Sequence, residues 1–442
     1  MSHSYKDVKD VVETCFAAKI PCLIWGPPGI GKSALVKDVA KKMTYTIAEN
    51  PELSRIHPKL TETYGQTFTG RRVSDVRLAL MSPTTIMGIP VYNSETRDAV
   101  WCMSGLFPTD PARVTELERL IVARNAAIDS QETDVQFLEL VDRLVDSLHQ
   151  QHSILFLDEL GQAPPATQAA AFGLLLDRKI QSYSLPVGVD IVSATNNNDD
   201  RAGVNRLSTP LVSRLAHVSM GASIDDWKAW AAESGIDTDI LAFVTSNAQW
   251  FHKFDPSTQN GSGVKLAFPC PRTWEMADRA LKSLRSANKD TDERIFITIS
   301  GCVGEAAANQ FIAWRNLYRK LPSPEEILSG RLKRSDVDFT AKDEYGTRHD
   351  VSLELCYILD TWKLFSGTIN RHDVEKRAER MISFITTSKN KEFEALLVSV
   401  VVRDLNSSGN RTTIGHLMKN EKFSEMLRNL LKDEVWESVK AK

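Results

Sequence analysis

Residues 26–33 read Gly26-Pro-Pro-Gly-Ile-Gly31-Lys32-Ser33, and they follow the short apolar run Cys22-Leu-Ile-Trp25. Downstream of this stretch, apolar side chains recur every four residues at Leu35, Val39 and Met43, which predicts a helix with one apolar face. A strand, a glycine-rich loop and a helix in that order satisfy G-x-x-x-x-G-K-[ST], the pattern of a phosphate-binding loop. The sequence therefore predicts a nucleotide site here.

The chemistry of such a loop follows from its backbone. Glycines let the chain bend so that successive N–H groups face phosphate oxygens, and the helix N-terminus adds partial positive charge. We expect Lys32 to reach the β- and γ-phosphates of ATP and the hydroxyl of Ser33 to ligate Mg²⁺. ATP and Mg²⁺ are thus the expected cofactors. The predicted contacts in this loop are Pro28, Gly29, Ile30, Gly31, Lys32, Ser33 and Ala34.

Two later apolar runs end in polar residues that complete such a site. The run 154–157 leads into Asp158 and Glu159, and a further strand-like run leads into Asn196. We predict that Asp158 holds Mg²⁺ and that Glu159 orients and deprotonates the attacking water. The short amide of Asn196 is predicted to bridge this water and the γ-phosphate, with Asn197 as the alternative.

The remaining pattern divides the chain into an α/β part and a helical part. Strand-like runs alternate with helical patterns over 1–221, which predicts a parallel sheet with helices on both faces. Within it, Pro and Gly punctuation predicts a hairpin-like insertion at about 73–110, and a helical insertion follows at about 111–151. Beyond it we predict a helical lid over 222–330 and a C-terminal helical extension over 331–442.

Composition restricts the classes of protein. The 442 residues exceed the ~300 at which single cores stop growing, so several domains are expected. Lys and Arg total 54 against 57 Asp and Glu, and the net charge of -3 gives no general attraction to nucleic acid or anionic membranes. The six cysteines are scattered, and no stretch approaches ~18 apolar residues. We therefore expect a cytoplasmic protein with reduced thiols and no membrane contact.

In order and spacing these motifs resemble those of the AAA+ ATPases, and within them the MoxR group. The resemblance implies a homo-oligomeric ring, usually a hexamer, with nucleotide bound between subunits. It also implies that Arg214 is the arginine finger reaching a neighbour's γ-phosphate, with Arg206 as the alternative, and that Arg272 is a second sensor on the lid. The stretches that carry it are Gly26–Ser33, Asp158-Glu159, Leu175-Leu-Asp-Arg178, Ala194-Thr-Asn196, Asp200-Arg-Ala-Gly-Val-Asn-Arg206 and Leu211-Val-Ser-Arg214.

The resemblance also implies a biological role. Such proteins remodel or activate another protein, commonly with a partner that bears a von Willebrand factor A domain. Residues 73–108 resemble the insertion that projects toward the ring's centre in this group, whereas a hairpin serving only stability is the plainer interpretation. The alternative function is a motor that translocates or loads nucleic acid, which predicts salt-sensitive binding to DNA or RNA. A scaffold that hydrolyses ATP slowly or not at all is disfavoured because Glu159 is present.

Overall fold

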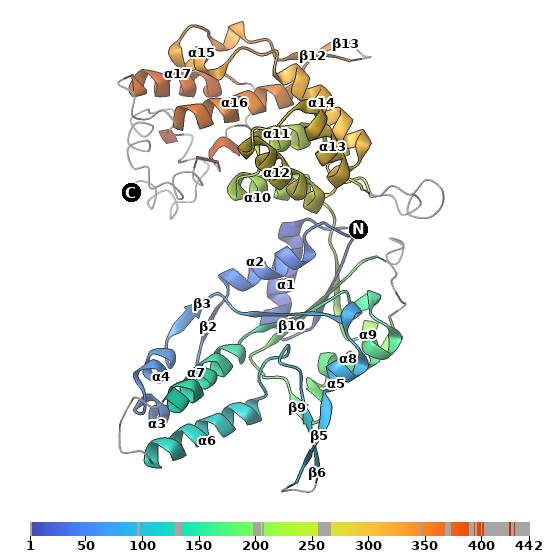
Figure 1. Ribbon diagram of the computed structural model, residues 1–442, viewed down its shortest axis with the longest axis vertical. Helices are drawn as coiled ribbons and strands as arrows, with labels where there is room; N and C mark the ends of the chain where they lie inside the picture. Colours follow the sequence, from blue (N-terminus) through green and yellow to red (C-terminus); the bar gives the residue numbers. More distant parts are fainter. Residues whose placement is uncertain are drawn as a thin grey trace. The chain divides into compact units, whose positions relative to one another are not determined.

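The computed structural model contains two compact units, Met1–Gly221 and Ala222–Lys442 (Figure 1). The structure describes residues 2–94, 98–127, 135–197, 205, 207–254, 267–343, 346–366 and 373–388, with isolated residues beyond these at 393, 396–398, 400–401, 424–425 and 428. Among the described residues, no helix combines the length and the apolar character needed to cross a bilayer.

The first unit is built on a five-stranded sheet with the order β11-β1-β10-β7-β4. Every neighbouring pair in this sheet is parallel. The predicted α/β fold is confirmed. The strands are β4 (Val73–Arg77), β7 (Ile154–Asp158), β10 (Asp190–Thr195), β11 (Ala216–Ser219) and β1 (Cys22–Trp25).

Helices cover both faces of this sheet (Figure 1). On one face lie α1 (Tyr5–Ala17) and α2 (Lys32–Lys42), which contact β1, β7 and β10. On the other face the alternate strand residues Leu23, Leu155 and Leu157 pack in one buried cluster with side chains of α8 (Pro165–Leu176) and α9 (Thr209–Val212). Burial on both faces explains why the strands read as continuous apolar runs rather than alternating ones.

The predicted insertion at about 73–110 needs a correction, because it begins with a strand of the central sheet. The alternation of Val76, Leu78 and Leu80 with polar or small residues predicts one strand, but β4 ends at Arg77 and residues Leu78–Leu80 form a 3₁₀ turn. The physical reason is the register: Arg77 pairs with Asp158, the last residue of β7, so the edge strand has no partner to continue along. The projecting hairpin consists of β5 (Ile89–Asn93) and β6 (Asp98–Cys102).

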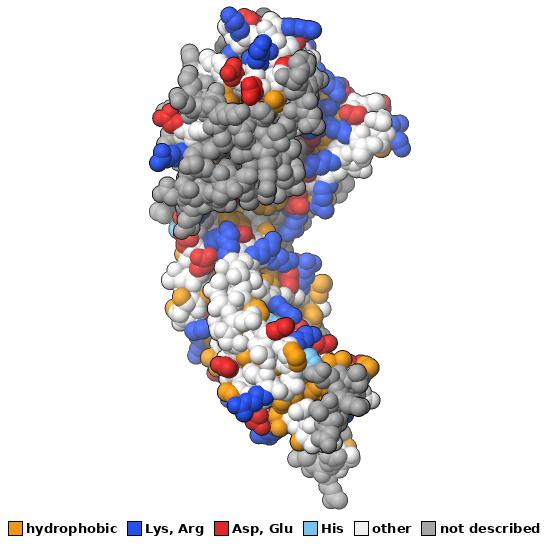
Figure 2. Space-filling view, turned by 90° about the vertical axis from the view of Figure 1, so that its left-hand side faces the viewer, with side chains coloured by type: hydrophobic (Ala, Val, Ile, Leu, Met, Phe, Trp, Pro, Cys, Tyr) orange, Lys and Arg blue, Asp and Glu red, His pale blue; other side chains and the backbone are white. Residues whose placement is uncertain are grey.

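This hairpin and its flanks expose large apolar side chains. Leu80, Ile89 and Tyr92 are each more than 65% exposed. Figure 2 shows hydrophobic side chains gathered around the lower end of the first unit, where Figure 1 places β5 and β6. The remaining elements of this unit are α3 (Pro51–Ser54), α4 (Pro58–Thr63), α5 (Pro83–Met87), α6 (Pro111–Ala127), α7 (Val135–Gln150) and the short pairs β2 (Thr44–Thr46) with β3 (Thr67–Thr69) and β8 (Lys179–Ile180) with β9 (Tyr183–Ser184).

A buried ionic hub closes the amino-terminal edge of the central sheet. Arg71 forms an ion pair with Asp190, and both side chains are almost fully buried. The same guanidinium donates to the backbone carbonyls of Ser153 at 2.9 Å and Gly188 at 2.8 Å, so its donors bind β10 and the segments that precede β7 and β10. Lys19 adds a second cation to Asp190 at 2.8 Å.

The described part of the second unit is helical apart from one hairpin. Its helices are α10 (Ile224–Ser234), α11 (Thr238–Ser246), α12 (Pro271–Ser286), α13 (Asp292–Val303), α14 (Glu305–Tyr318), α15 (Pro324–Ser329), α16 (Val351–Ser366) and α17 (Val374–Thr386). The charged stretch 333–350 predicts a loop, but strands β12 (Thr340–Asp343) and β13 (Gly346–His349) pair antiparallel within it. These strands could not be predicted from the sequence, because their residues are mostly polar and show no apolar alternation.

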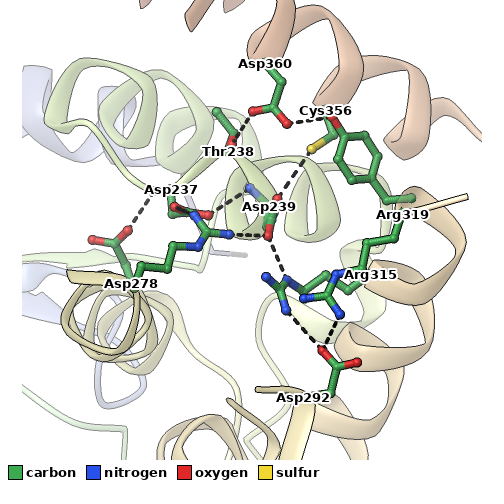
Figure 3. Close-up of polar contacts among 11 residues, drawn as sticks. Asp237, Thr238, Asp239, Asp278, Asp292, Arg315, Arg319, Cys356 and Asp360 are labelled. Atoms are coloured by element: carbon green, nitrogen blue, oxygen red, sulfur yellow. Dashed lines mark hydrogen bonds and ion pairs between the residues drawn. The ribbon is translucent and has the colours of Figure 1, made fainter. Parts of the chain in front are cut away.

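A buried polar network ties the helices of this unit together (Figure 3). Asp239 accepts from Arg285 at 2.5 Å and from Arg315 at 2.9 Å, which joins α11 to α12 and α14. Asp237 caps α11 and also pairs with Arg285. Asp278 on α12 accepts from the backbone N–H of Asp237 at 2.7 Å. Because buried charges are tolerated only when paired, this network specifies how the helices meet.

One corner of the network resembles a metal site but is already satisfied. Asp239, Cys356 and Asp360 place ligand-type atoms within 4.8 Å of one another. However, the two carboxylate oxygens of Asp360 accept from Thr238 at 2.9 Å and Tyr318 at 2.6 Å, and the Cys356 thiol donates to Asp239 at 3.7 Å (Figure 3). These hydrogen bonds account for the buried oxygens without an ion.

Candidate active site

The phosphate-binding pattern occupies the turn between β1 and α2. Gly31 is the N-cap of α2, with a φ of 99°, and Gly29 has a φ of 78°. Residues that carry a side chain rarely adopt this left-handed backbone conformation, so glycine is required at both positions. At Gly26 the reason is steric, since a Cβ there would lie 2.5 Å from the carbonyl oxygen of Met220.

Lys32 is buried and its ammonium group is held inside the loop. It donates to the carbonyl oxygens of Gly26 at 2.6 Å and Pro27 at 3.0 Å, and to Oδ1 of Asn196 at 2.9 Å. The last contact joins α2 to the end of β10. It also orients the Asn196 amide, because an ammonium group can bind only the oxygen end.

Ser33 and Asp158 are in contact at the carboxyl edge of the sheet. The hydroxyl of Ser33 donates to Oδ2 of Asp158 at 3.0 Å, and Oδ1 of Asp158 accepts from the backbone N–H of Glu159 at 2.9 Å. A hydroxyl and a carboxylate oxygen at this separation match the oxygen donors that Mg²⁺ prefers, with the other positions open to water and phosphate. The chemistry of the donor set therefore fits this cation.

Glu159 has an unusual backbone conformation. Its φ of 59° and ψ of 35° place it in the left-handed region, which is uncommon for a residue with a Cβ. The conformation turns the chain sharply after β7, where the Glu159 carbonyl accepts from the N–H groups of Gln162 at 3.0 Å and Ala163 at 3.1 Å. Strained residues of this kind are common at functional sites, and Glu159 is the one that directly follows Asp158.

The structure brings some of the predicted residues together and leaves others apart or undescribed. Lys32, Ser33, Asp158 and Asn196 are joined by direct contacts at the carboxyl edge of the sheet, with Glu159 adjacent in the chain. Ile30 lies in the same loop with its side chain buried, so only its backbone can face a ligand.

The predicted arginines are not among these contacts. Arg214 is exposed just after α9, where it donates to the carbonyl of Pro210 at 3.0 Å and lies 5.9 Å from the centre of the Phe172 ring. Arg272 is exposed in the first turn of α12, in the second unit. Arg206 and the stretch 200–204 lie outside the described residues.

Two contributors were missed by sequence reasoning. Thr195 is buried at the end of β10, and its hydroxyl accepts from the N–H of Gly161 at 3.2 Å, which fixes the turn that follows Glu159. Arg77 lies directly beside Asp158 in the register of β4 and β7. The available signal was positional, since both residues end a strand at the edge that carries the predicted site.

Comparison with known proteins identifies the domain. Residues 6–189 match the AAA ATPase domain family, which covers less than half of the chain. The matched region contains the phosphate-binding loop, Asp158 and Glu159. The chain therefore carries an AAA ATPase domain and is an ATPase. No curated protein matches the sequence.

Two solved structures show distant similarity to the chain. The ORC2 protein of Aeropyrum pernix, solved as ADPNP and ADP complexes, is 12% identical with a TM-score of 0.31, and the match covers 73% of this chain and 71% of that one. NtrX of Brucella abortus is 14% identical with a TM-score of 0.32, over 91% of this chain and 68% of that one. Scores this low establish no shared arrangement over the whole chain.

Proposed function

We propose that this ATPase, whose AAA domain matches over residues 6–189, hydrolyses ATP with Mg²⁺ at the carboxyl edge of the central sheet. The observation that carries the proposal is the convergence of Lys32, Ser33, Asp158 and Asn196 on one point. Lys32 exchanges its loop carbonyls for phosphate oxygens, so a triphosphate replaces the contacts to Gly26 and Pro27.

Ser33 and Asp158 are the proposed holders of the cation. When bound, Mg²⁺ supplies positive charge that neutralises the β- and γ-phosphate oxygens. Glu159 orients the attacking water and accepts its proton, and its position directly after Asp158 keeps it at the same strand end. The Asn196 amide, whose oxygen is bound to Lys32, presents its N–H₂ group to the water or the γ-phosphate.

We further propose that the active unit is a ring, most simply a hexamer of the MoxR type, acting in the cytoplasm. Arg214 is exposed and so is accessible to a neighbouring subunit's nucleotide, and Arg272 is the proposed sensor on the second unit. A trans arginine is worth about 10³–10⁵ in rate, so an isolated chain should turn over very slowly.

The proposed work of the ring is to remodel or activate a protein client, together with a partner that bears a von Willebrand factor A domain. The exposed apolar side chains of the β5–β6 hairpin support a protein client, because apolar surface of this kind binds proteins rather than phosphate backbones. The near-neutral charge of the chain also favours this reading over a nucleic-acid motor.

A mixing experiment tests the shared site. Glu159→Gln retains Arg214 but lacks the base, and Arg214→Ala retains the base but lacks the finger. Each variant alone should bind ATP and show almost no turnover, whereas an equimolar mixture should recover activity because each site can draw one group from a neighbour. Full turnover by Arg214→Ala alone, or no recovery on mixing, would contradict the trans assignment. Stimulation by added DNA or RNA would instead favour the nucleic-acid motor.

A further inference from the structure

An exposed histidine links the phosphate-binding loop to the segment that carries Arg214. The indole N–H of Trp25 donates to Nδ1 of His217 at 2.8 Å, and Nε2 of His217 lies 2.7 Å from the carbonyl oxygen of Val212. The two rings also stack, with centroids 6.0 Å apart and planes 27° from parallel. The contact joins residues 192 positions apart in the sequence.

Only one form of the histidine satisfies both contacts. An indole N–H can only donate and a backbone carbonyl can only accept. Nδ1 must therefore be unprotonated, and Nε2 must carry the hydrogen that binds Val212. His217 is thus a directional link with one accepting and one donating end.

Each end of this link adjoins a residue of the proposed mechanism. Trp25 is the last residue of β1 and immediately precedes Gly26, the first residue of the phosphate-binding loop. Val212 is the last residue of α9, two positions before Arg214. A histidine donor on this terminal carbonyl fixes the residue at which α9 ends, and therefore the backbone position from which the Arg214 side chain extends.

We propose that His217 is a positioning residue that couples the phosphate-binding loop of one subunit to the arginine that the same subunit offers to its neighbour. The inference rests on the proposed function, because it assumes that Arg214 acts in trans. His217 is not proposed to contact ATP or the attacking water. It acts through Trp25 on one side and through the end of α9 on the other.

Three substitutions separate the two ends of the link. In His217→Asn the amide oxygen lies close to the position of Nδ1, so the bond from Trp25 is kept and the bond to Val212 is lost. In His217→Gln the amide nitrogen lies close to the position of Nε2, so the reverse holds. Trp25→Phe removes only the indole donor. His217 is exposed, so these changes should leave the fold intact.

We expect each variant to lower kcat by about 10- to 100-fold at chain concentrations that saturate assembly, since small misplacements of a reacting group cost up to about 10²-fold. The Kd for ATP, measured by calorimetry, should stay unchanged. Because Trp25→Phe and His217→Gln break the same bond, the double variant should be no slower than the slower single variant.

The outcomes separate this inference from the proposed function. If the His217 variants have a lowered melting temperature and an unchanged kcat, His217 is only structural. If His217→Gln has a normal kcat and His217→Asn a lowered one, His217 only caps α9. Either result overturns the coupling. If Arg214→Ala itself keeps full turnover, the proposed function of Arg214 as a trans finger is wrong, whatever the His217 variants show. If Arg214→Ala is inactive while the His217 variants are fully active, the coupling alone is wrong.

Discussion

Replacing Glu159 with glycine should make the protein more stable and inactive at the same time. Glu159 has a φ of 59° and a ψ of 35°, a conformation that costs roughly 1–2 kcal/mol for a residue with a Cβ. Glycine adopts it freely, but glycine's greater freedom in the unfolded chain offsets roughly 0.4–1 kcal/mol of that gain. The backbone hydrogen bonds of the turn do not involve the side chain and are kept.

At the middle of these ranges the net gain for Glu159→Gly is about 0.8 kcal/mol, which for a unit of this size corresponds to a rise in melting temperature of roughly 2–3 °C. Scanning calorimetry of the full chain without nucleotide measures this rise. Steady-state turnover should fall about 10²- to 10⁴-fold because the general base is lost. Binding of ATP with Mg²⁺, measured by titration calorimetry, should be retained.

Two matched variants control the experiment. Glu159→Gln keeps the strained backbone and removes the base, so it should lose turnover without gaining stability. Gln181→Gly relieves a similar φ of 51° in the exposed turn between β8 and β9, so it should gain stability and keep turnover. A Glu159→Gly chain that melts below the Glu159→Gln chain would refute the strain argument, and one that still hydrolyses ATP would refute the role of the side chain.

Three further predictions concern stability and the cation. Arg71→Met should cost about 3–5 kcal/mol in urea unfolding because it leaves Asp190 buried without its main partner, and adding Asp190→Leu should restore most of the loss. Burial, with the neighbouring Asp239, raises the pKa of Asp237 to about 6, so the folded state binds the extra proton and stability falls as the pH rises from about 4 to 6. Asp237→Asn should remove this fall, by at most roughly 3 kcal/mol, in melts across that range. Ser33→Ala should raise the Mg²⁺ concentration needed for half-maximal turnover, and an unchanged Mg²⁺ dependence would exclude Ser33 as a ligand.

The phosphate-binding loop could be predicted from sequence because its determinants are local. Gly29 and Gly31 are required by their own φ values, and the order of strand, loop and helix is visible in a short window. The placement of Asp158 and Asn196 was also predictable, since parallel strands present their carboxyl ends at one edge of a sheet. The roles of Arg214 and Arg272 came from resemblance and stay proposals.

The local sequence pattern did not predict those strand boundaries that depend on pairing with another strand. The length of β4 is set by the residue at which its partner β7 ends. The pairing of β12 with β13 could not be predicted, because neither strand shows apolar alternation. The left-handed turn at Glu159 has no sequence signal either, because a glutamate gives no hint that the chain must reverse there.

By itself, the sequence determined the type of fold and which residues are proposed to bind phosphate, since apolar periodicity and glycine placement act over a few neighbouring positions. The tertiary structure alone decided which distant polar groups meet: Arg71 with Asp190, and Trp25 with His217, across more than 100 residues in each case. Such contacts depend on how packed strands and helices bring side chains together, and no local pattern records that geometry.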